Sequence, residues 1–273
     1  MDPAKRRRLI LVSSIVVASL AGLSGATLGM VGLDRYVDQI ACRRTTPQLV
    51  LTDMPNEIAD LAQAEVEQSV IPLLRENWTD PTLPRRMAES LAAVGWVGRV
   101  RFVRRTGDGR FGVSCRYRVP VARIRQGGSF ILVDAEGIRL PGTYWQAAEW
   151  MLIEGVEQPA PLAGEVWKGS DLQVGLAMVQ LLRGEPFLDQ IRSIRVENSG
   201  GRKDRWRSHV EIATDEPNGR IRWGSPPGAE IEENSAAEKL ALLRENYRRT
   251  SRIDANYLVI DVSTFPDRFT VPG

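Results

Sequence analysis

Side chains suited to acid–base or nucleophilic chemistry are scarce in this chain of 273 residues. It contains a single histidine, His209, and two cysteines, Cys42 and Cys115. One imidazole cannot form an acid–base pair of histidines, and it gives too few ligands for a histidine metal site. Ser170 and Asp171 precede an apolar stretch of helical spacing, where we expect them to cap a helix. The composition therefore predicts no catalytic residues and no metal site.

Motifs that bind cofactors or activate nucleophiles are also missing from the sequence. There is no G-x-S-x-G elbow, no phosphate-binding glycine loop and no C-x-x-C pair, so we expect no cofactor and no small-molecule substrate. One alternative stays open, an exported enzyme acting on cell-wall material through carboxylates such as Asp134, Glu136 or Asp261. Such an enzyme needs two carboxylates facing each other across a cleft. Glu136 stands before Gly137, which first indicates a turn.

Charge is nearly balanced along the chain. Lysine and arginine total 36 against 34 aspartates and glutamates, a net charge of +2. The basic residues are interleaved with acidic ones, which is typical of a solvated surface and predicts no nucleic-acid partner. Cys115 falls on the apolar side of an alternating stretch, so we expect a buried thiol there, whereas Cys42 lies nearer the N-terminus. A disulfide between them is not expected.

The N-terminal region has the pattern of a membrane anchor. Residues 9–33 carry no charge, follow the basic residues 5–8 and end before Asp34 and Arg35. A helix rises about 1.5 Å per residue, so about 20 apolar residues cross a hydrocarbon core roughly 30 Å thick. The basic cluster keeps residues 1–8 in the cytoplasm by the positive-inside rule. The sequence thus predicts a single-pass protein of the cytoplasmic (inner) membrane, with residues 34–273 outside the cytoplasm.

A cleaved secretory signal is the alternative for the same segment, because Ser24, Gly25 and Ala26 resemble a cleavage site. Retention is favoured because the apolar character continues through Leu33, beyond the length of a typical signal core. Ala21, Gly25 and Gly29 lie one helical turn apart and form a small-residue face on which another membrane helix could pack. A high content of small residues without any partner explains the same pattern.

The periodicity of residues 47–120 predicts a β-α-α-β-β domain behind a tether at residues 34–46. A strand at 48–52 precedes a helix that begins near residue 57 and that Pro72 should kink or end. A second helix is expected over 83–93. Residues 99–103 and 110–119 alternate as a hairpin with one buried face. The predicted boundary to the next domain is near Pro120.

Residues 121–265 predict a mostly antiparallel β domain with two helices, followed by a tail at 266–273, so the fold class is α+β. Helical spacing marks residues 172–183 and 235–247. Residues 149–165, which include Pro159 and Pro161, are expected to be irregular. The remaining alternating segments predict strands at 121–124, 130–134, 191–197, 206–212, 220–224 and 257–262.

Several segments, in this order and spacing, resemble one known family. They are residues 95–104 (GWVGRVRFVR), the junction at 119–122 with 133–137, and residues 218–224, 238–243 and 260–262. Over nearly its whole length the chain is similar to the FtsQ/DivIB family of bacterial cell-division proteins. It departs from that family at Ser263, where an arginine is often found. The resemblance implies a membrane helix, a POTRA domain and a β domain that ends in an exposed strand.

The resemblance also implies a function. Members of this family are non-enzymatic scaffolds that bind the coiled-coil division proteins FtsB and FtsL, and a partner strand that adds to an exposed sheet edge explains such binding physically. The residues expected to form this edge are Tyr257, Leu258, Val259, Ile260, Asp261 and Val262, with Thr264, Phe265 and Phe269 beside them. Another POTRA-containing envelope protein, in secretion or outer-membrane assembly, is the alternative.

A basic group near Trp206 is the second predicted contact region. Arg202, Lys203 and Arg205 stand within four residues of one another, and they could meet an acidic partner. A polar turn without any partner explains the same residues.

Overall fold

The structure, a computed structural model, describes Gly32 and residues 48–76, 80–106 and 109–264. Apart from Gly32, the predicted membrane helix at 9–33 therefore lies outside the described residues, as do Ala21, Gly25, Gly29 and Cys42. Within the described residues, no helix is both long enough and apolar enough to cross a bilayer.

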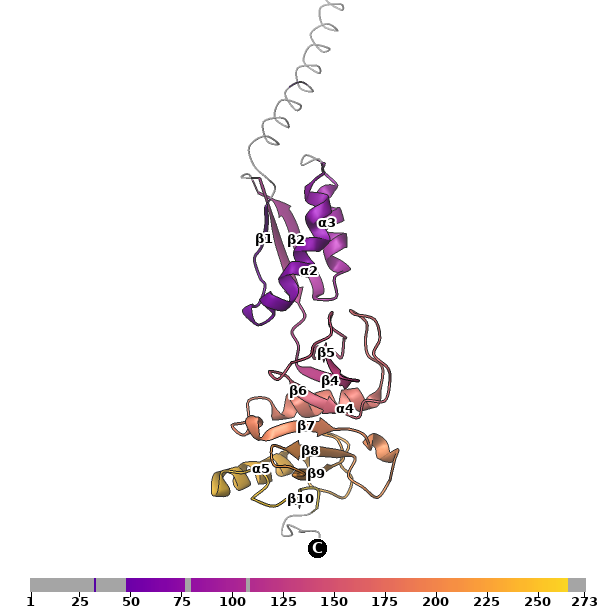
Figure 1. The fold of residues 1–273 in the computed structure, drawn as a ribbon, viewed down its shortest axis with the longest axis vertical. Coiled ribbons are helices and arrows are strands. Elements are labelled where there is room, and N and C mark those ends of the chain that lie inside the picture. The colour runs from indigo at the N-terminus through magenta and orange to yellow at the C-terminus, as the bar shows by residue number, and fades with distance from the viewer. Residues whose placement is uncertain (1–31, 33–47, 77–79, 107–108, 265–273) are drawn as a thin grey trace, which may run out of the picture. The chain divides into compact units, whose positions relative to one another are not determined.

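The first sheet and its helices follow the predicted element order. The elements are β1 (Gln48–Leu51), α2 (Asn56–Leu74), α3 (Leu83–Ala92), β2 (Val97–Arg105) and β3 (Arg110–Tyr117). The strand order is β1-β3-β2, and β1 runs parallel to β3. Figure 1 labels β1, β2 and the two helices. This parallel pairing is possible because the two helices carry the chain from one strand to the other. The predicted β-α-α-β-β succession is confirmed.

Burial within this region follows the predicted periodicity except on β2. Ile58, Ala62, Val66 and Val70 of α2 are fully buried, and α2 continues to Leu74, two residues past Pro72. The alternating side chains of β3, including Cys115, are buried as well. Phe102 on β2 is 36% exposed. The expectation of a buried face on both strands of the hairpin is wrong for β2, because this strand lies at the sheet edge with a neighbour on one side only.

The second sheet has seven strands in the order β10-β9-β8-β7-β6-β4-β5. The strands are β4 (Ala122–Gln126), β5 (Ser129–Val133), β6 (Met151–Glu154), β7 (Ile191–Arg195), β8 (Val210–Thr214), β9 (Arg220–Gly224) and β10 (Val259–Asp261). Three of its six pairings are parallel and three are antiparallel. The expectation of a mostly antiparallel sheet is therefore wrong, because the chain repeatedly crosses over between parallel neighbours.

Two sequence predictions fail inside this sheet. β6 lies in the segment expected to be irregular, and it pairs with β4 on one side and β7 on the other. A short strand buried on both faces shows a continuous apolar run rather than alternation, which hides it from a period-two pattern. β8 begins at Val210, four residues after the expected start, because Trp206 lies in the preceding loop and is 84% exposed.

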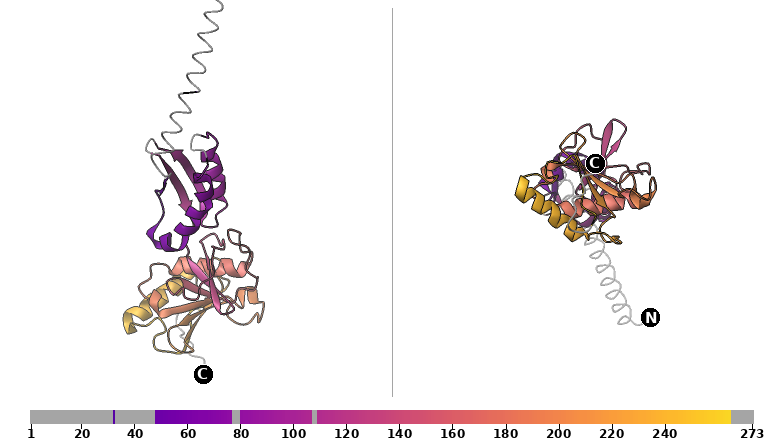
Figure 2. Two further views of the ribbon diagram at one scale, coloured as in Figure 1. Left: turned by 45° about the horizontal axis from the view of Figure 1, so that its top comes forward. Right: turned by 90° about the horizontal axis from the view of Figure 1, so that it is seen from below.

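One row of isoleucines runs across the whole sheet. Each strand contributes one member at the same register position, in the order Ile260, Ile221, Ile212, Ile194, Ile153, Ile124 and Ile131. All are at most 3% exposed, and they form one core with apolar residues of α4 (Ser170–Leu182) and α5 (Ala236–Thr250). Both helices therefore cover the isoleucine face (Figure 2). At Gly175, α4 approaches β6 so closely that a Cβ atom would lie 2.7 Å from Ile153.

Candidate interaction edge

The strand β10 is the last strand of the seven-stranded sheet, and within the described residues only β9 pairs with it. The amide of Arg220 donates to the carbonyl of Leu258 (2.8 Å), and the amide of Val262 donates to the carbonyl of Arg222 (3.1 Å). Successive residues of a strand direct their backbone groups to opposite edges. The amides and carbonyls of Val259 and Asp261 therefore face away from β9, toward the open side of the sheet.

The side chains of the predicted edge divide into two groups. Tyr257 and Leu258 are 48% and 58% exposed, and Thr264 is also exposed. Ile260 and Val262 are buried in the core, so their side chains are not available as contact residues. This corrects the sequence prediction, because alternation along a strand sends every second side chain into the core. Phe265 and Phe269 lie outside the described residues.

The turn before β10 is fixed by an ion-pair network. Arg252 bonds both oxygens of Asp254, and it also bonds Asp215, which follows β8, at 2.8 Å. Asp254 is 1% exposed and accepts the amide of Asn256 at 3.0 Å. Burial acts to raise the pKa of Asp254, but the hydrogen bonds from Arg252 and Asn256 and the charge of Arg252 outweigh it and lower that pKa. The ionised carboxylate thus orients the chain as it enters β10.

The segment after β10 is held by one buried amide. The side chain of Asn234, 2% exposed, donates to the carbonyls of Val262 (3.0 Å) and Thr264 (2.5 Å). Its own backbone amide donates to the carbonyl of Ser263 at 2.8 Å. Sequence reasoning missed Asn234, because its position before the helix cap Ser235 is typical of a helix start. These three hydrogen bonds join residues 28 to 30 positions apart, so the pattern of neighbouring residues does not reveal them.

A buried lysine supports the same end of the sheet. Lys239 of α5 is fully buried, and its ammonium lies 3.1 Å from the carboxylate of Glu233 and 5.4 Å from the ring centre of Trp223 on β9. Buried charges are tolerated when they are paired and hydrogen-bonded. The pair fixes the loop between β9 and α5, which also carries Asn234. The sequence pattern placed Lys239 on a helix but gave no sign that its ammonium would be buried.

The predicted basic group does not act as a unit. Arg202 binds the carboxylate of Asp171 at 2.9 Å and the carbonyls of Gly155 and Glu197 at 2.6 and 2.9 Å. It therefore anchors its own loop. Lys203 is exposed beside Glu197 (3.1 Å), and Arg205 lies over the exposed ring of Trp206.

The loop that carries Lys203 lies at one end of the sheet together with the end of β10. It leads into β8, whose first residue Val210 pairs with Gly224 at the end of β9, and β10 runs parallel to β9. Lys203 is thus at the same end of the sheet as Thr264, although β8 and β9 lie between them.

The carboxylates considered for catalysis are dispersed. Asp134 is buried beside Arg118 (2.8 Å) and accepts the amides of Glu136 and Ile138, so it shapes a turn. It directly follows β5, whereas Asp261 lies on β10 at the opposite edge. Six strand spacings of about 4.8 Å place these edges roughly 29 Å apart. Such a separation is too large for two carboxylates that share one glycosidic bond.

The residues predicted to cap α4 have another role. The N-cap is Gly169, and no side chain caps it. Asp171 instead accepts the amides of Glu157 and Leu172, both at 2.8 Å, and binds Arg202. Burial acts to raise the pKa of Asp171, but these hydrogen bonds and the arginine charge lower it. The capping prediction is wrong because α4 has Gly169 at its N-cap, and the carboxylate of Asp171 joins the first turn of α4 to the loops that carry Glu157 and Arg202.

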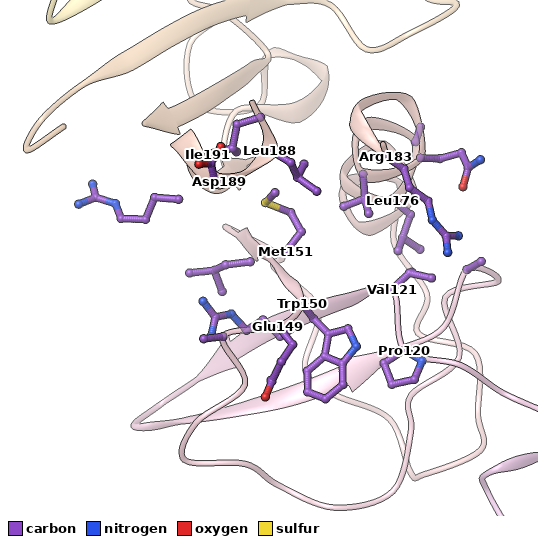
Figure 3. Close-up of a pocket in the computed structure, with 18 of the residues that line it drawn as sticks. Pro120, Val121, Glu149, Trp150, Met151, Leu176, Arg183, Leu188, Asp189 and Ile191 are labelled. Carbon is purple, nitrogen blue, oxygen red and sulfur yellow. The ribbon is translucent and has the colours of Figure 1, made fainter. Parts of the chain in front are cut away.

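A groove of about 810 Å³ lies beside α4. Its apolar lining includes Trp150, Met151, Leu176 and Ile191, and Figure 3 shows Glu149 and Asp189 at opposite ends of it. The lining residues include no Ser, Thr, Cys, His, Lys or Tyr. The groove can hold apolar side chains, and the carboxylates that line it are those of Glu149 and Asp189.

The described residues give little support for a metal site or for catalysis by His209. No cluster of three or more His, Cys, Asp or Glu side chains that could hold a metal ion occurs among the described residues. His209 is half-buried in the loop before β8 rather than in the expected strand. The strongest candidate is therefore the open edge of β10, a surface of backbone hydrogen-bonding groups.

Comparisons with known proteins add no family to this description. No model of a known protein family matches the chain, and no curated protein sequence matches it.

Proposed function

We propose that this protein is a non-enzymatic scaffold, anchored in the bacterial inner membrane by residues 9–33, that recruits FtsB/FtsL-type division proteins by strand addition to β10. In this proposal residues 34–273 lie outside the cytoplasm, and residues 47–120 form a POTRA domain. The proposal combines the resemblance of the sequence to the FtsQ/DivIB family with the properties of one edge of the sheet.

The observation that carries the proposal is the open edge of β10. Val259 and Asp261 direct amides and carbonyls away from β9, and in the described residues nothing pairs with them. An unpaired edge is a template for another chain, and proteins usually block such edges. The turns on both sides of β10 are fixed by Arg252 with Asp254 and by Asn234, so the edge is preorganised for a partner strand.

The test removes a single outward amide. Val259→Pro deletes the donor that faces the open side, whereas Val259→Ala keeps that donor and shortens the side chain. The full-length chain would be used to pull down the FtsB/FtsL-type pair of the same bacterium. We expect Val259→Pro to lose most of the captured pair and Val259→Ala to retain it. Equal capture by both variants, with unchanged thermal stability, would remove strand addition at β10 from the proposal.

The position of the protein in the cell distinguishes the proposed division scaffold from the alternative, a protein of secretion or outer-membrane assembly. A scaffold of the division machinery should gather at mid-cell as a fluorescent fusion, and Val259→Pro should disturb division. A POTRA-containing protein of secretion or outer-membrane assembly should instead be distributed around the envelope. A uniform envelope signal in dividing cells would favour that second function.

A further inference from the structure

A row of alternating charges crosses the outer face of the seven-stranded sheet. It lies one residue beyond the isoleucine row on each strand, so its side chains occupy the opposite face. From β10 to β4 its members are Asp261, Arg222, Glu211, Arg195, Glu154 and Arg125. Each acidic residue stands beside a basic one on the neighbouring strand. We call this row the charge ladder.

The charge ladder makes ion pairs at the β4 end. Glu154 lies 3.6 Å from Arg195 and 3.9 Å from Arg125. Arg125 in turn lies 5.2 Å from the ring centre of Phe130 on β5. The ladder therefore ends on an aromatic ring at the β5 edge. Opposite charges directly across two strands stabilise their pairing, and like charges destabilise it.

At the β10 edge the charge ladder ends on a carboxylate. The Oδ1 atom of Asp261 accepts the amide of Ser263 at 2.9 Å and the hydroxyl of Ser263 at 2.6 Å. Among the described residues, no hydrogen bond reaches Oδ2 and no basic side chain comes within ion-pairing distance of it. The side chain is partly exposed. Ser263 thus orients a carboxylate that, among residues 48–264 as far as the structure describes them, has an opposite charge beside it on β9 and none on its outer side.

We propose that the strand which adds to β10 places a lysine or arginine opposite Asp261. The inference rests on the proposed strand addition and specifies the chemistry of the partner. A strand that pairs with Val259 and Asp261 lies about 4.8 Å beyond β10, and directly opposed residues share one face of the sheet. Its basic side chain continues the alternation of the charge ladder. The neighbouring residue, opposite Ile260, faces the side covered by the helices and is apolar, so the partner strand alternates apolar and basic or polar residues.

The test changes only the charge of Asp261. Asp261→Asn keeps an Oδ1 acceptor for Ser263 and every backbone group, whereas Asp261→Lys reverses the charge. With the full-length chain and the FtsB/FtsL-type pair, we expect Asp261→Asn to weaken binding about two- to fivefold, as loss of one cross-strand charge pair does. Asp261→Lys should weaken it about tenfold or more. Changing the basic residue of the partner strand to glutamate should restore binding to Asp261→Lys and not to the wild-type chain.

The possible outcomes test the basic partner residue separately from the proposed strand addition to β10. If Val259→Pro abolishes binding while Asp261→Lys binds like wild type, strand addition stands and the basic partner residue is refuted. If neither variant affects binding, the proposed function fails as well. If Asp261→Lys alters only self-association in analytical ultracentrifugation, a second copy of this chain occupies the edge and the inference is overturned.

Discussion

The two edges of the seven-stranded sheet are treated in opposite ways. At the β5 edge the chain covers itself: Phe130 and Tyr144 exchange amide–carbonyl hydrogen bonds of 2.7 and 2.9 Å, and Leu140 donates to Leu132 at 2.9 Å. At the β10 edge no described segment adds a strand beyond Val259 and Asp261. A sheet that protects one edge with its own backbone has the means to protect both. This contrast is the basis of the proposal that the open edge binds a partner strand.

The interactions that hold the two edges in position differ as well. Buried and half-buried polar groups hold the segments on both sides of the open edge. They are Lys239 with Glu233, Asn234, and Arg252 with Asp254. The β5 edge rests on backbone pairing with residues 138–144. A polar network fixes the position of a strand without occupying its outer backbone groups. Four predictions test this contrast, beginning with the largest expected effect.

Lys239→Met should destabilise the protein by about 3 kcal/mol, because it leaves the mostly buried carboxylate of Glu233, whose side chain is 13% exposed, without its ammonium partner. The free energy of unfolding of the full-length chain in denaturant measures this. Hydrogen exchange should rise first in β9 and β10 and last in β4 and β5. The double variant Lys239→Met with Glu233→Gln is the control and should recover part of the loss. A cost below about 1 kcal/mol for the single variant contradicts a structural role for the pair.

Hydrogen exchange of the unmodified chain compares the edges directly. The amides of Phe130, Leu140 and Tyr144 donate to carbonyls, whereas those of Val259 and Asp261 face the open side. We expect the two β10 amides to exchange about a hundredfold faster, because their exchange needs little opening of the sheet. Addition of the division partners should slow them. Equal protection at both edges without any partner would show that the β10 edge is already covered.

Asp254 predicts a pH dependence at the open edge. Its pKa is lowered in the folded protein from the ordinary value of 3.8, so the unfolded chain takes up its proton first as the pH falls. The stability from Asp254 is therefore complete above pH 3.8 and is lost as the pH drops through the lower folded pKa. Asp254→Asn should lower the free energy of unfolding at pH 7. The difference in that free energy between the variant and the wild-type chain should become smaller below pH 3.8. A difference that stays constant down to the acid transition would exclude this linkage.

Lys203→Ala should have the smallest effect. The residue is exposed, and its ion pair with Glu197 is a surface pair, so the stability should change by less than about 0.5 kcal/mol. Lys203 lies at the same end of the strands as Thr264, with β8 and β9 between them, and we expect at most a weak, salt-dependent contribution to partner binding. Arg202→Ala is the contrasting variant, because Arg202 anchors the loop through Asp171 and its loss should destabilise measurably. Similar effects of the two changes would contradict this division of roles.

The candidate edge was only partly predictable. Alternation in residues 257–262 predicted a strand there, and the structure has one at Val259–Asp261. Alternation could not show that Ile260 and Val262 would point into the core while Tyr257 and Leu258 stayed exposed. That depends on which face α4 and α5 cover.

The sequence by itself determined the features that arise from neighbouring residues. Helical spacing located α2, α3, α4 and α5 to within a few residues, and alternation located most strands, because side chains three to four or two positions apart share a face. The membrane anchor at 9–33, the division function and its partners stay predictions.

Only the tertiary structure decided the order of the strands and therefore the open edge. The central position of β6, the alignment of Ile124, Ile153 and Ile194, and the charge ladder all depend on pairings between residues far apart in the chain. Asn234 and Lys239 act through hydrogen bonds and ion pairs that leave no periodic pattern. Local periodicity tells which face of a strand is apolar, but its neighbours are chosen by packing of the whole sheet against the helices.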